Sequence, residues 1–176
     1  VQLKTGKTIY GVNTGFGSLC QIKIDEKDQK KLQLNLVRSH SSGVGEPLEP
    51  GLVRVILVLK LLTYVKGYSG IRPVLAKKIV QFVNSDVLPV IPKKGSVGAS
   101  GDLAPLGHMA LSLISEGQVF YKGKKMPTKT ALIKARIKPI VLHPKEGISL
   151  INGTQVSTSL AIKALLDGDI LKKTAD

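Results

Sequence analysis

The sequence predicts a mainly α-helical fold, with a glycine-rich loop near its start and one small β-hairpin. Residues 52–62 are apolar almost all round, which is typical of a buried central helix. Two other segments, 74–83 and 156–165, repeat apolar residues at helical spacing. Pro50 and Pro73 stand where a first helical turn accepts proline. Helices this apolar cannot stand alone, so we expect further chain or other subunits to cover them.

The first predicted element is the glycine-rich loop over residues 10–20. Helices are then predicted, in chain order, at about residues 25–40, 50–66, 73–85, 102–115 and 128–135, with a last one that begins near Val156. Asp102 is predicted as the N-cap of the fourth of these helices and Thr128 as the cap of the fifth.

Two segments between the helices are predicted to be extended. Residues 87–96 contain prolines and lead into a glycine-rich stretch, so we expect an irregular strand there. Residues 119–126 place apolar and aromatic side chains on both sides of Lys122-Gly123, which predicts a hairpin. No internal repeat or low-complexity linker divides the chain, so we treat residues 1–176 as one unit.

The composition argues against several classes of function. A formal charge of +14 invites a nucleic-acid partner, but aromatic residues make up only 4% and the lysines are scattered in pairs, so no nucleic-acid binding is expected. Arg54 and Lys60 interrupt the apolar run before the roughly 18 residues that a membrane span needs. Cys20 is the single cysteine, which favours a cytoplasmic location. No group of residues has metal-ligand spacing.

The segment Gly95–Leu106 contains the tripeptide with the most specific chemistry, Ala99-Ser100-Gly101. The Gly101 nitrogen can attack the carbonyl carbon of Ala99 with loss of one water, and the Ser100 hydroxyl then leaves as a second water. The product is a methylidene-imidazolone ring whose exocyclic alkene is a strong electrophile. Gly101 suits this reaction because no side chain blocks its nitrogen. For the tripeptide taken alone, the commoner interpretation is a loop that caps a helix.

Five blocks of sequence, in order, resemble the aromatic amino acid ammonia-lyase and aminomutase family, whose members carry this ring. The blocks are YGVNTGFG at 10–17, LQLNLVRSH at 32–40, KGYSGIR at 66–72, GSVGASGDLAPLGHM at 95–109 and KEGISLINGTQ at 145–155. The chain departs from the family at Gly107, where Ala or Ser is usual, and at Ile148-Ser149, which replace a Leu-Ala pair. The resemblance implies a long-helix-bundle fold. Because family members are several times longer, it also implies that residues 1–176 are the N-terminal portion of a larger catalytic domain.

The resemblance assigns a role to each candidate residue. Ala99, Ser100 and Gly101 would form the prosthetic group autocatalytically, with no external cofactor. Tyr10 matches the base that removes the β-proton of the bound amino acid, although a tyrosine there is more commonly a packing residue on general grounds. Asn152 matches a contact to the prosthetic group or the substrate amine, and its alternative role is a turn residue. The positions that match the lining of the substrate pocket are Leu103 and Gly17.

A lone histidine near a helix end is more commonly structural, bonding a C-terminal carbonyl. The pair Ser39-His40, however, resembles histidine ammonia-lyases at the position where the family reads the substrate ring, so we expect His40 to bind substrate. An imidazole suits an imidazole substrate because each ring can donate or accept a hydrogen bond. The expected reaction is therefore conversion of L-histidine to trans-urocanate and ammonia by a homotetramer. Another ammonia-lyase, a 2,3-aminomutase or a non-catalytic fragment of the fold are the alternatives. The isolated chain is expected to be inactive, because further substrate contacts lie beyond it.

Overall fold

A computed structural model of the chain describes residues 7–175, and its helices bear out the predicted mainly helical class. They are α1 (Gln29–His40), α2 (Pro50–Val65), α3 (Pro73–Asn84), α4 (Leu103–Leu113), α5 (Thr128–Ala135), α6 (Glu146–Ile151) and α7 (Gln155–Ala175). Of these, only α6 is not among the predicted helices. The two ends of the predicted unit, residues 1–6 and 176, lie outside the described residues.

The strands form two small antiparallel sheets. The predicted hairpin forms from β4 (Gln118–Tyr121) and β5 (Lys124–Pro127), and β2 (Val87–Pro89) adds a third strand to it. Lys122 and Gly123 both have positive φ, as a two-residue hairpin turn requires. The second sheet pairs β1 (Val44–Pro47) with β3 (Pro92–Lys94). The sequence did not predict β1, because its glycine and proline are untypical of strands.

One predicted helix cap is wrong, and the other is confirmed in its position only. Thr128 is the first residue of α5 rather than its cap, because Pro127 occupies the N-cap position, and the buried Thr128 hydroxyl has no hydrogen-bond partner among the described residues. Asp102 does stand at the N-cap position of α4, yet its side chain makes no capping hydrogen bond there. The start of the first predicted helix also differs, since Glu26–Asp28 form a separate 3₁₀ turn, η3, before α1.

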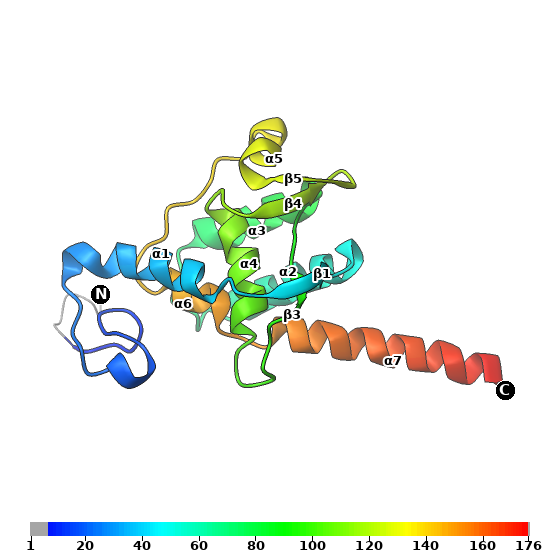
Figure 1. The fold of residues 1–176 in the computed structure, drawn as a ribbon, viewed down its shortest axis with the longest axis horizontal. Coiled ribbons are helices and arrows are strands. Elements are labelled where there is room, and N and C mark those ends of the chain that lie inside the picture. Colours follow the sequence, from blue (N-terminus) through cyan, green and yellow to red (C-terminus); the bar gives the residue numbers. More distant parts are fainter. Residues whose placement is uncertain (1–6, 176) are drawn as a thin grey trace.

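The core lies around α4, which packs against α1 and α6 (Figure 1). Leu106, Met109 and Leu113 of α4 are fully buried. On α2 the side chains of one face are buried, but Val58, Leu62 and Val65 on the other face are exposed. The expected burial of α2 on every side therefore holds for one face only within the described part of the chain. No helix in residues 7–175 is long and apolar enough to cross a membrane.

The long helix α7 extends away from the rest of the molecule (Figure 1). Its buried side chains all lie in the first two turns, at Gln155, Val156 and Ser159. Several large apolar side chains farther along are exposed, namely Leu160, Leu165, Leu166, Ile170 and Leu171. This surface agrees with the expectation that the helices of this chain need further partners.

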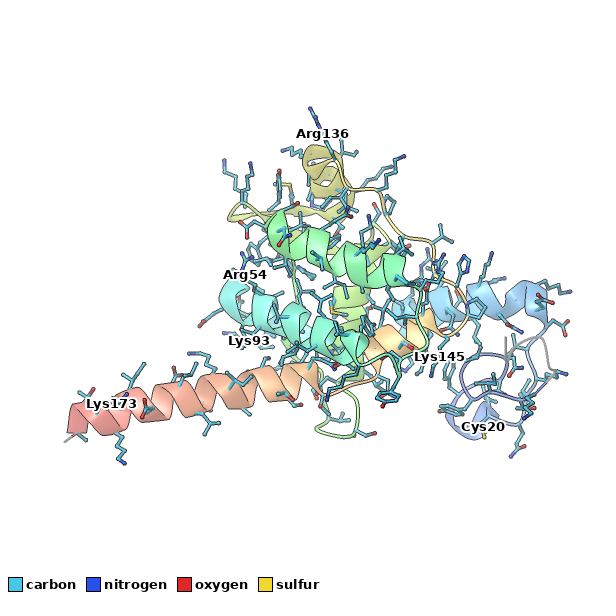
Figure 2. All side chains as sticks on the ribbon, turned by 180° about the vertical axis from the view of Figure 1, so that it is seen from behind. Cys20, Arg54, Lys93, Arg136, Lys145 and Lys173 are labelled. Carbon is cyan, nitrogen blue, oxygen red and sulfur yellow. The ribbon has the colours of Figure 1, made fainter. Side chains whose placement is uncertain are left out.

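The basic side chains are spread over many elements. Figure 2 labels five of them, which come from α2, β3, the end of α5, the start of α6 and the end of α7: Arg54, Lys93, Arg136, Lys145 and Lys173. The positive charge therefore does not gather on one helix or strand.

Candidate active site

All eight residues predicted for the site line one cavity of about 450 Å³. Tyr10 and Gly17 come from the loop before α1, and His40 is the last residue of α1. Ala99, Ser100 and Gly101 lie in the loop before α4, Leu103 is the first residue of α4, and Asn152 directly follows α6. The sequence did not predict the remaining lining residues, which are Phe16, Ser18, Leu36, Val97, Ile148 and Ile151. The fold thus gathers four of the five family-like blocks around one space.

The glycine-rich loop places Tyr10 at the edge of this cavity. Its hydroxyl accepts a hydrogen bond from the Gly17 backbone N–H at 3.2 Å, and its ring meets that of Phe16 edge to face at 6.0 Å. The loop is fastened to the helices by the buried side chain of Gln33. Gln33 Nε2 donates to the Gly11 carbonyl at 2.9 Å, and Gln33 Oε1 accepts from the Ile148 N–H at 3.1 Å. One amide therefore joins the Tyr10 loop, α1 and α6.

His40 lies at the last residue of α1, with its imidazole bordering the cavity. His40 Nδ1 lies 2.9 Å from the Leu36 carbonyl oxygen and 3.1 Å from Ser39 Oγ. Because a carbonyl oxygen can only accept, the bond to Leu36 assigns the proton of a neutral ring to Nδ1. The other ring nitrogen, Nε2, is then a hydrogen-bond acceptor.

The tripeptide lies beside Asn152. A Cβ atom on Gly101 would lie only 2.5 Å from Asn152 Oδ1 and 3.3 Å from Leu103 Cδ2, so a side chain at this position would require the Asn152 amide to move. Ala99 and Ser100 are exposed, whereas Gly101 and Asp102 are buried. The tripeptide therefore has one anchored end and one accessible end.

Asp102 anchors that end by capping a different helix from the one predicted. Its Oδ2 accepts from the backbone N–H groups of Val156 at 2.9 Å and Ser157 at 2.8 Å, which are donors in the first turn of α7. Its Oδ1 accepts from the hydroxyls of Ser96 and Ser157. A carboxylate is favourable at a helix N-terminus because it meets free N–H groups and the positive end of the dipole. The tripeptide is thereby tied directly to the start of α7.

Glu146 fixes the first turn of α6, the helix that ends at Asn152. Its buried carboxylate accepts from Arg72 Nε and Nη2, both at 2.8 Å, and from the backbone N–H groups of Arg72 and His143. Burial raises the pKa of Glu146, but the hydrogen bonds from Arg72 and His143 outweigh it and hold the pKa below its usual range. The ion pair accounts physically for the family-like block at 66–72, which lies outside the cavity lining.

Two neighbours of the cavity serve packing. His108 Nε2 accepts from the Gly43 N–H at 3.0 Å, and burial lowers the pKa of His108. Gly107 lies directly against the end of α1, where an added Cβ would lie 2.9 Å from Ser41 Oγ and 3.1 Å from the His40 carbonyl carbon. The unusual glycine therefore allows α4 to approach the helix that carries His40.

Sequence reasoning missed Lys60, which is fully buried next to the α6–α7 turn. In the sequence, Lys60 is interpreted only as an interruption of the apolar run at 52–62. A lone charge in the middle of such a run is itself a signal, because a buried charge is retained only where it finds partners.

Known proteins resemble this chain over nearly its whole length. The histidine ammonia-lyases of Geobacillus thermodenitrificans and Aliivibrio fischeri are each 50% identical to it, over 96% and 98% of the chain and 34% of their own length. The chain thus spans about a third of the length of these curated relatives. Among solved structures, the phenylalanine aminomutase of Pantoea agglomerans matches 99% of this chain over 33% of the aminomutase chain, with a TM-score of 0.93 at 32% identity.

The structure of the histidine ammonia-lyase of Trypanosoma cruzi matches 93% of this chain over 32% of the lyase chain, with a TM-score of 0.85 at 39% identity. The family model described as aromatic amino acid lyase matches residues 2–176. The described fold, its cavity and these matches lead to one assignment. The chain belongs to the aromatic amino acid lyase family.

Proposed function

We propose that the full-length product of the gene that encodes this chain is a histidine ammonia-lyase, which converts L-histidine to trans-urocanate and ammonia. The observation that carries the proposal is the hydrogen-bond state of His40 in the shared cavity. With Nδ1 donating to Leu36, the lone pair of Nε2 can accept the ring N–H of a substrate imidazole. A benzene ring offers no such donor. The identity to enzymes named histidine ammonia-lyase supports the same substrate.

The residues at 99–101 fit the methylidene-imidazolone group. Gly101 lets its backbone approach the Asn152 amide closely, and Ala99 and Ser100 lie at the cavity wall, where a substrate can reach them. Once formed, the group would supply an electrophilic alkene for the amine or the ring of the substrate. Asp102, through its hydrogen bonds to Ser96 and α7, holds the C-terminal end of the reacting segment in place.

Tyr10 is the proposed base. Its oxygen already accepts the Gly17 N–H, and that donor would serve the phenolate that takes up the β-proton. As the proton moves to Tyr10, the electron pair of the C–H bond forms the Cα–Cβ double bond and the C–N bond breaks. Ammonia then leaves, and the product is the conjugated acid.

A 2,3-aminomutase is the second candidate. The similarity to the phenylalanine aminomutase structure, and to the tyrosine aminomutase of Streptomyces globisporus at 40% identity, favours it specifically. The same site would then return the amine to the β-carbon instead of releasing it. The two reactions differ in product only, so product analysis separates them.

The proposed assembly, location and cofactor requirement follow from the same assignment. The exposed apolar side chains of α7 and of the outer face of α2 support assembly into a homotetramer, with neighbouring chain covering them. The single cysteine supports a cytoplasmic location. No external cofactor is required, since the proposed electrophile comes from the chain itself.

The test is to incubate the purified full-length gene product with L-histidine, L-phenylalanine and L-tyrosine. Urocanate and ammonia in equal amounts from histidine support the proposal, whereas β-amino acids identify an aminomutase. Intact mass should show the loss of two waters within the peptide 95–106. An unmodified peptide together with no product from any substrate would indicate a non-catalytic member of the fold.

A further inference from the structure

Lys60 is a buried charge that the reaction proposed above does not use. It lies in the middle of α2, its exposed fraction is 0%, and a buried ammonium is costly unless hydrogen bonds compensate for lost water. Burial lowers the pKa of Lys60 to about 7, while the negative charge of Asp102 acts in the opposite direction. A buried lysine is therefore expected to make specific contacts that compensate for the cost of its burial.

The ammonium of Lys60 reaches the turn that carries Asn152. Lys60 Nζ lies 3.4 Å from the Asn152 carbonyl oxygen and 3.4 Å from Gln155 Oε1. The ring of Tyr64 lies beneath it, with its centre 5.5 Å from Nζ. Both oxygen acceptors belong to the junction of α6 and α7, so a single side chain links α2 to this junction.

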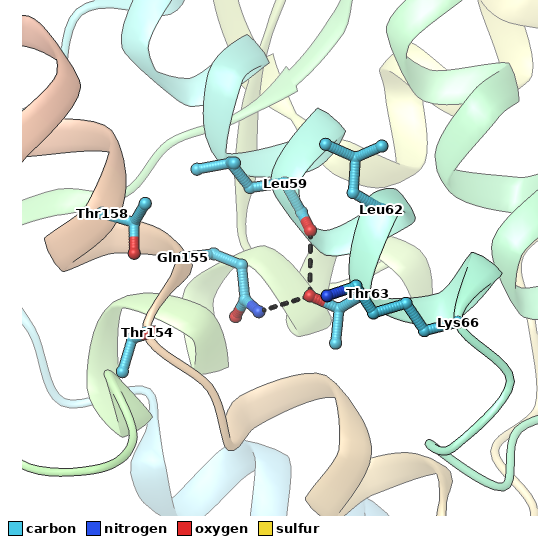
Figure 3. Close-up of a pocket in the computed structure, with 7 residues that line it drawn as sticks. All are labelled: Leu59, Leu62, Thr63, Lys66, Thr154, Gln155 and Thr158. Carbon is cyan, nitrogen blue, oxygen red and sulfur yellow. Dashed lines mark hydrogen bonds between the residues drawn. The ribbon is translucent and has the colours of Figure 1, made fainter.

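The Gln155 amide is oriented for this contact by hydrogen bonds that Figure 3 shows. Thr63 Oγ1 donates to the Leu59 carbonyl at 3.0 Å, so it is free to accept from Gln155 Nε2, also at 3.0 Å. The amide oxygen of Gln155 therefore faces Lys60. Thr63 and Gln155 also line a separate cavity of about 260 Å³ between α2 and α7, so this support lies outside the cavity that holds the tripeptide.

The turn at Asn152 is held on both sides of the carbonyl that Lys60 contacts. The Asn152 N–H donates to the Ile148 carbonyl at 2.9 Å, and the Gly153 carbonyl accepts from the Asp102 N–H at 2.7 Å. The Asn152 side chain lies against Gly101 at the other face of the turn. Without Lys60, the Asn152 carbonyl would lose the donor that fixes its peptide plane, and the side chain could turn away from Gly101.

We propose that Lys60 is a positioning residue, which holds the backbone of Asn152 so that the Asn152 amide is directed at the Gly101 end of the tripeptide. The proposal rests on the function proposed above, because it gives Asn152 a part in that reaction. Lys60 does not line the cavity itself, and the lining residue that it hydrogen-bonds is Asn152, so it acts through Asn152.

The test compares Lys60→Met, which keeps the length of the side chain without its charge, with Lys60→Arg, which keeps a cation. Both are made in the full-length gene product. Displacement of a reacting group by about 1 Å can cost on the order of 100-fold in rate, so K60M should lower kcat on L-histidine about 10- to 100-fold. K60R should recover most of that loss. Lys78→Met is the matched control, because Lys78 is also buried in a helix but, among residues 7–175, its ammonium hydrogen-bonds only to Gln81.

The decisive measurement is the effect of K60M on kcat in a protein that also carries Asn152→Ala. If Lys60 acts through Asn152, K60M should cost less than about 3-fold there, because coupled residues are not additive. An equal cost in both backgrounds, an unaltered kcat in K60M or an equal effect of K78M would overturn the proposal. Should K60M fail to fold, Lys60→Gln takes its place.

A failure of the proposed function is distinguishable from a failure of this inference. If the unmodified protein releases no ammonia from any substrate tested, the proposed function fails. Crystal structures of the unmodified protein and K60M then decide the role of Lys60. A shift of the Asn152 amide away from Gly101 in K60M would support the positioning role, and an unmoved amide would refute it.

Discussion

Replacing Glu146 with Gln tests whether the ion pair to Arg72 holds the helix that carries Asn152. Each carboxylate oxygen of Glu146 accepts two hydrogen bonds, one pair from Arg72 N and Nε and the other from Arg72 Nη2 and His143 N. A glutamine has one oxygen, so whichever way its amide turns, two donors face its NH₂ group. Half of the hydrogen bonds are therefore lost.

The magnitude follows from the burial of the two partners. A hydrogen bond to a charged group contributes about 1.5–3 kcal/mol, so two lost bonds correspond to roughly 3–6 kcal/mol. The Glu146 side chain is 1% exposed, but that of Arg72 is 37% exposed and can recover water. We therefore expect E146Q to lower the free energy of unfolding by about 3 kcal/mol, the lower end of that range.

The assay is urea unfolding of the full-length gene product followed by circular dichroism, with Glu116→Gln as control. Glu116 pairs with Arg38 in similar geometry, but these side chains are 37% and 50% exposed, so E116Q should cost less than about 1 kcal/mol. The Glu146 pKa is below its unfolded value, so its contribution is complete above about pH 4.5 and disappears as the pH falls through the folded pKa. Equal costs for the two variants at neutral pH would refute the reasoning.

Four further outcomes are expected. Ser100→Ala should abolish the proposed loss of two waters, measured by intact mass, since no hydroxyl remains to leave, and a retained loss would exclude Ser100 as its source. Tyr10→Phe should lower kcat about 10²- to 10⁴-fold with a smaller change in KM, as loss of a general base does, and a change of only a few-fold would assign the base elsewhere. Replacing Ser39-His40 with Phe-Leu should shift the ratio of kcat/KM for histidine over phenylalanine by roughly one to two decades, and an unchanged ratio would remove His40 from substrate selection. The Lys60 pKa falls from 10.5 to about 7 on folding, so between about pH 7 and pH 10.5 the unfolded chain binds more protons than the folded chain. The free energy of unfolding should therefore rise with pH over this range, and K60M should lack this rise in urea titrations.

Local sequence features predicted most of the fold. The helices that begin at Pro50 and Pro73 and the hairpin around Lys122-Gly123 depend on residues next to one another in the chain, and all three form as expected. Family-like blocks selected the eight cavity residues. The contacts that hold those residues in place were not predictable in this way. The Asp102 carboxylate bonds to residues 54 and 55 positions away, and Lys60 to one 92 positions away, so no local pattern signals them.

The capping of α7 by Asp102 sets an order of events during synthesis of the chain. Residues 99–101 leave the ribosome first, while the amide groups that fix the adjacent carboxylate are still to be made. At the roughly 5–20 residues per second of translation, the 54 positions between Asp102 and Val156 correspond to a delay of about 3 to 11 seconds. During that interval the Asp102 carboxylate lacks the two backbone donors of α7. Any cyclisation that needs the held geometry is therefore a late step, which follows the arrival of α7 rather than the formation of the local turn.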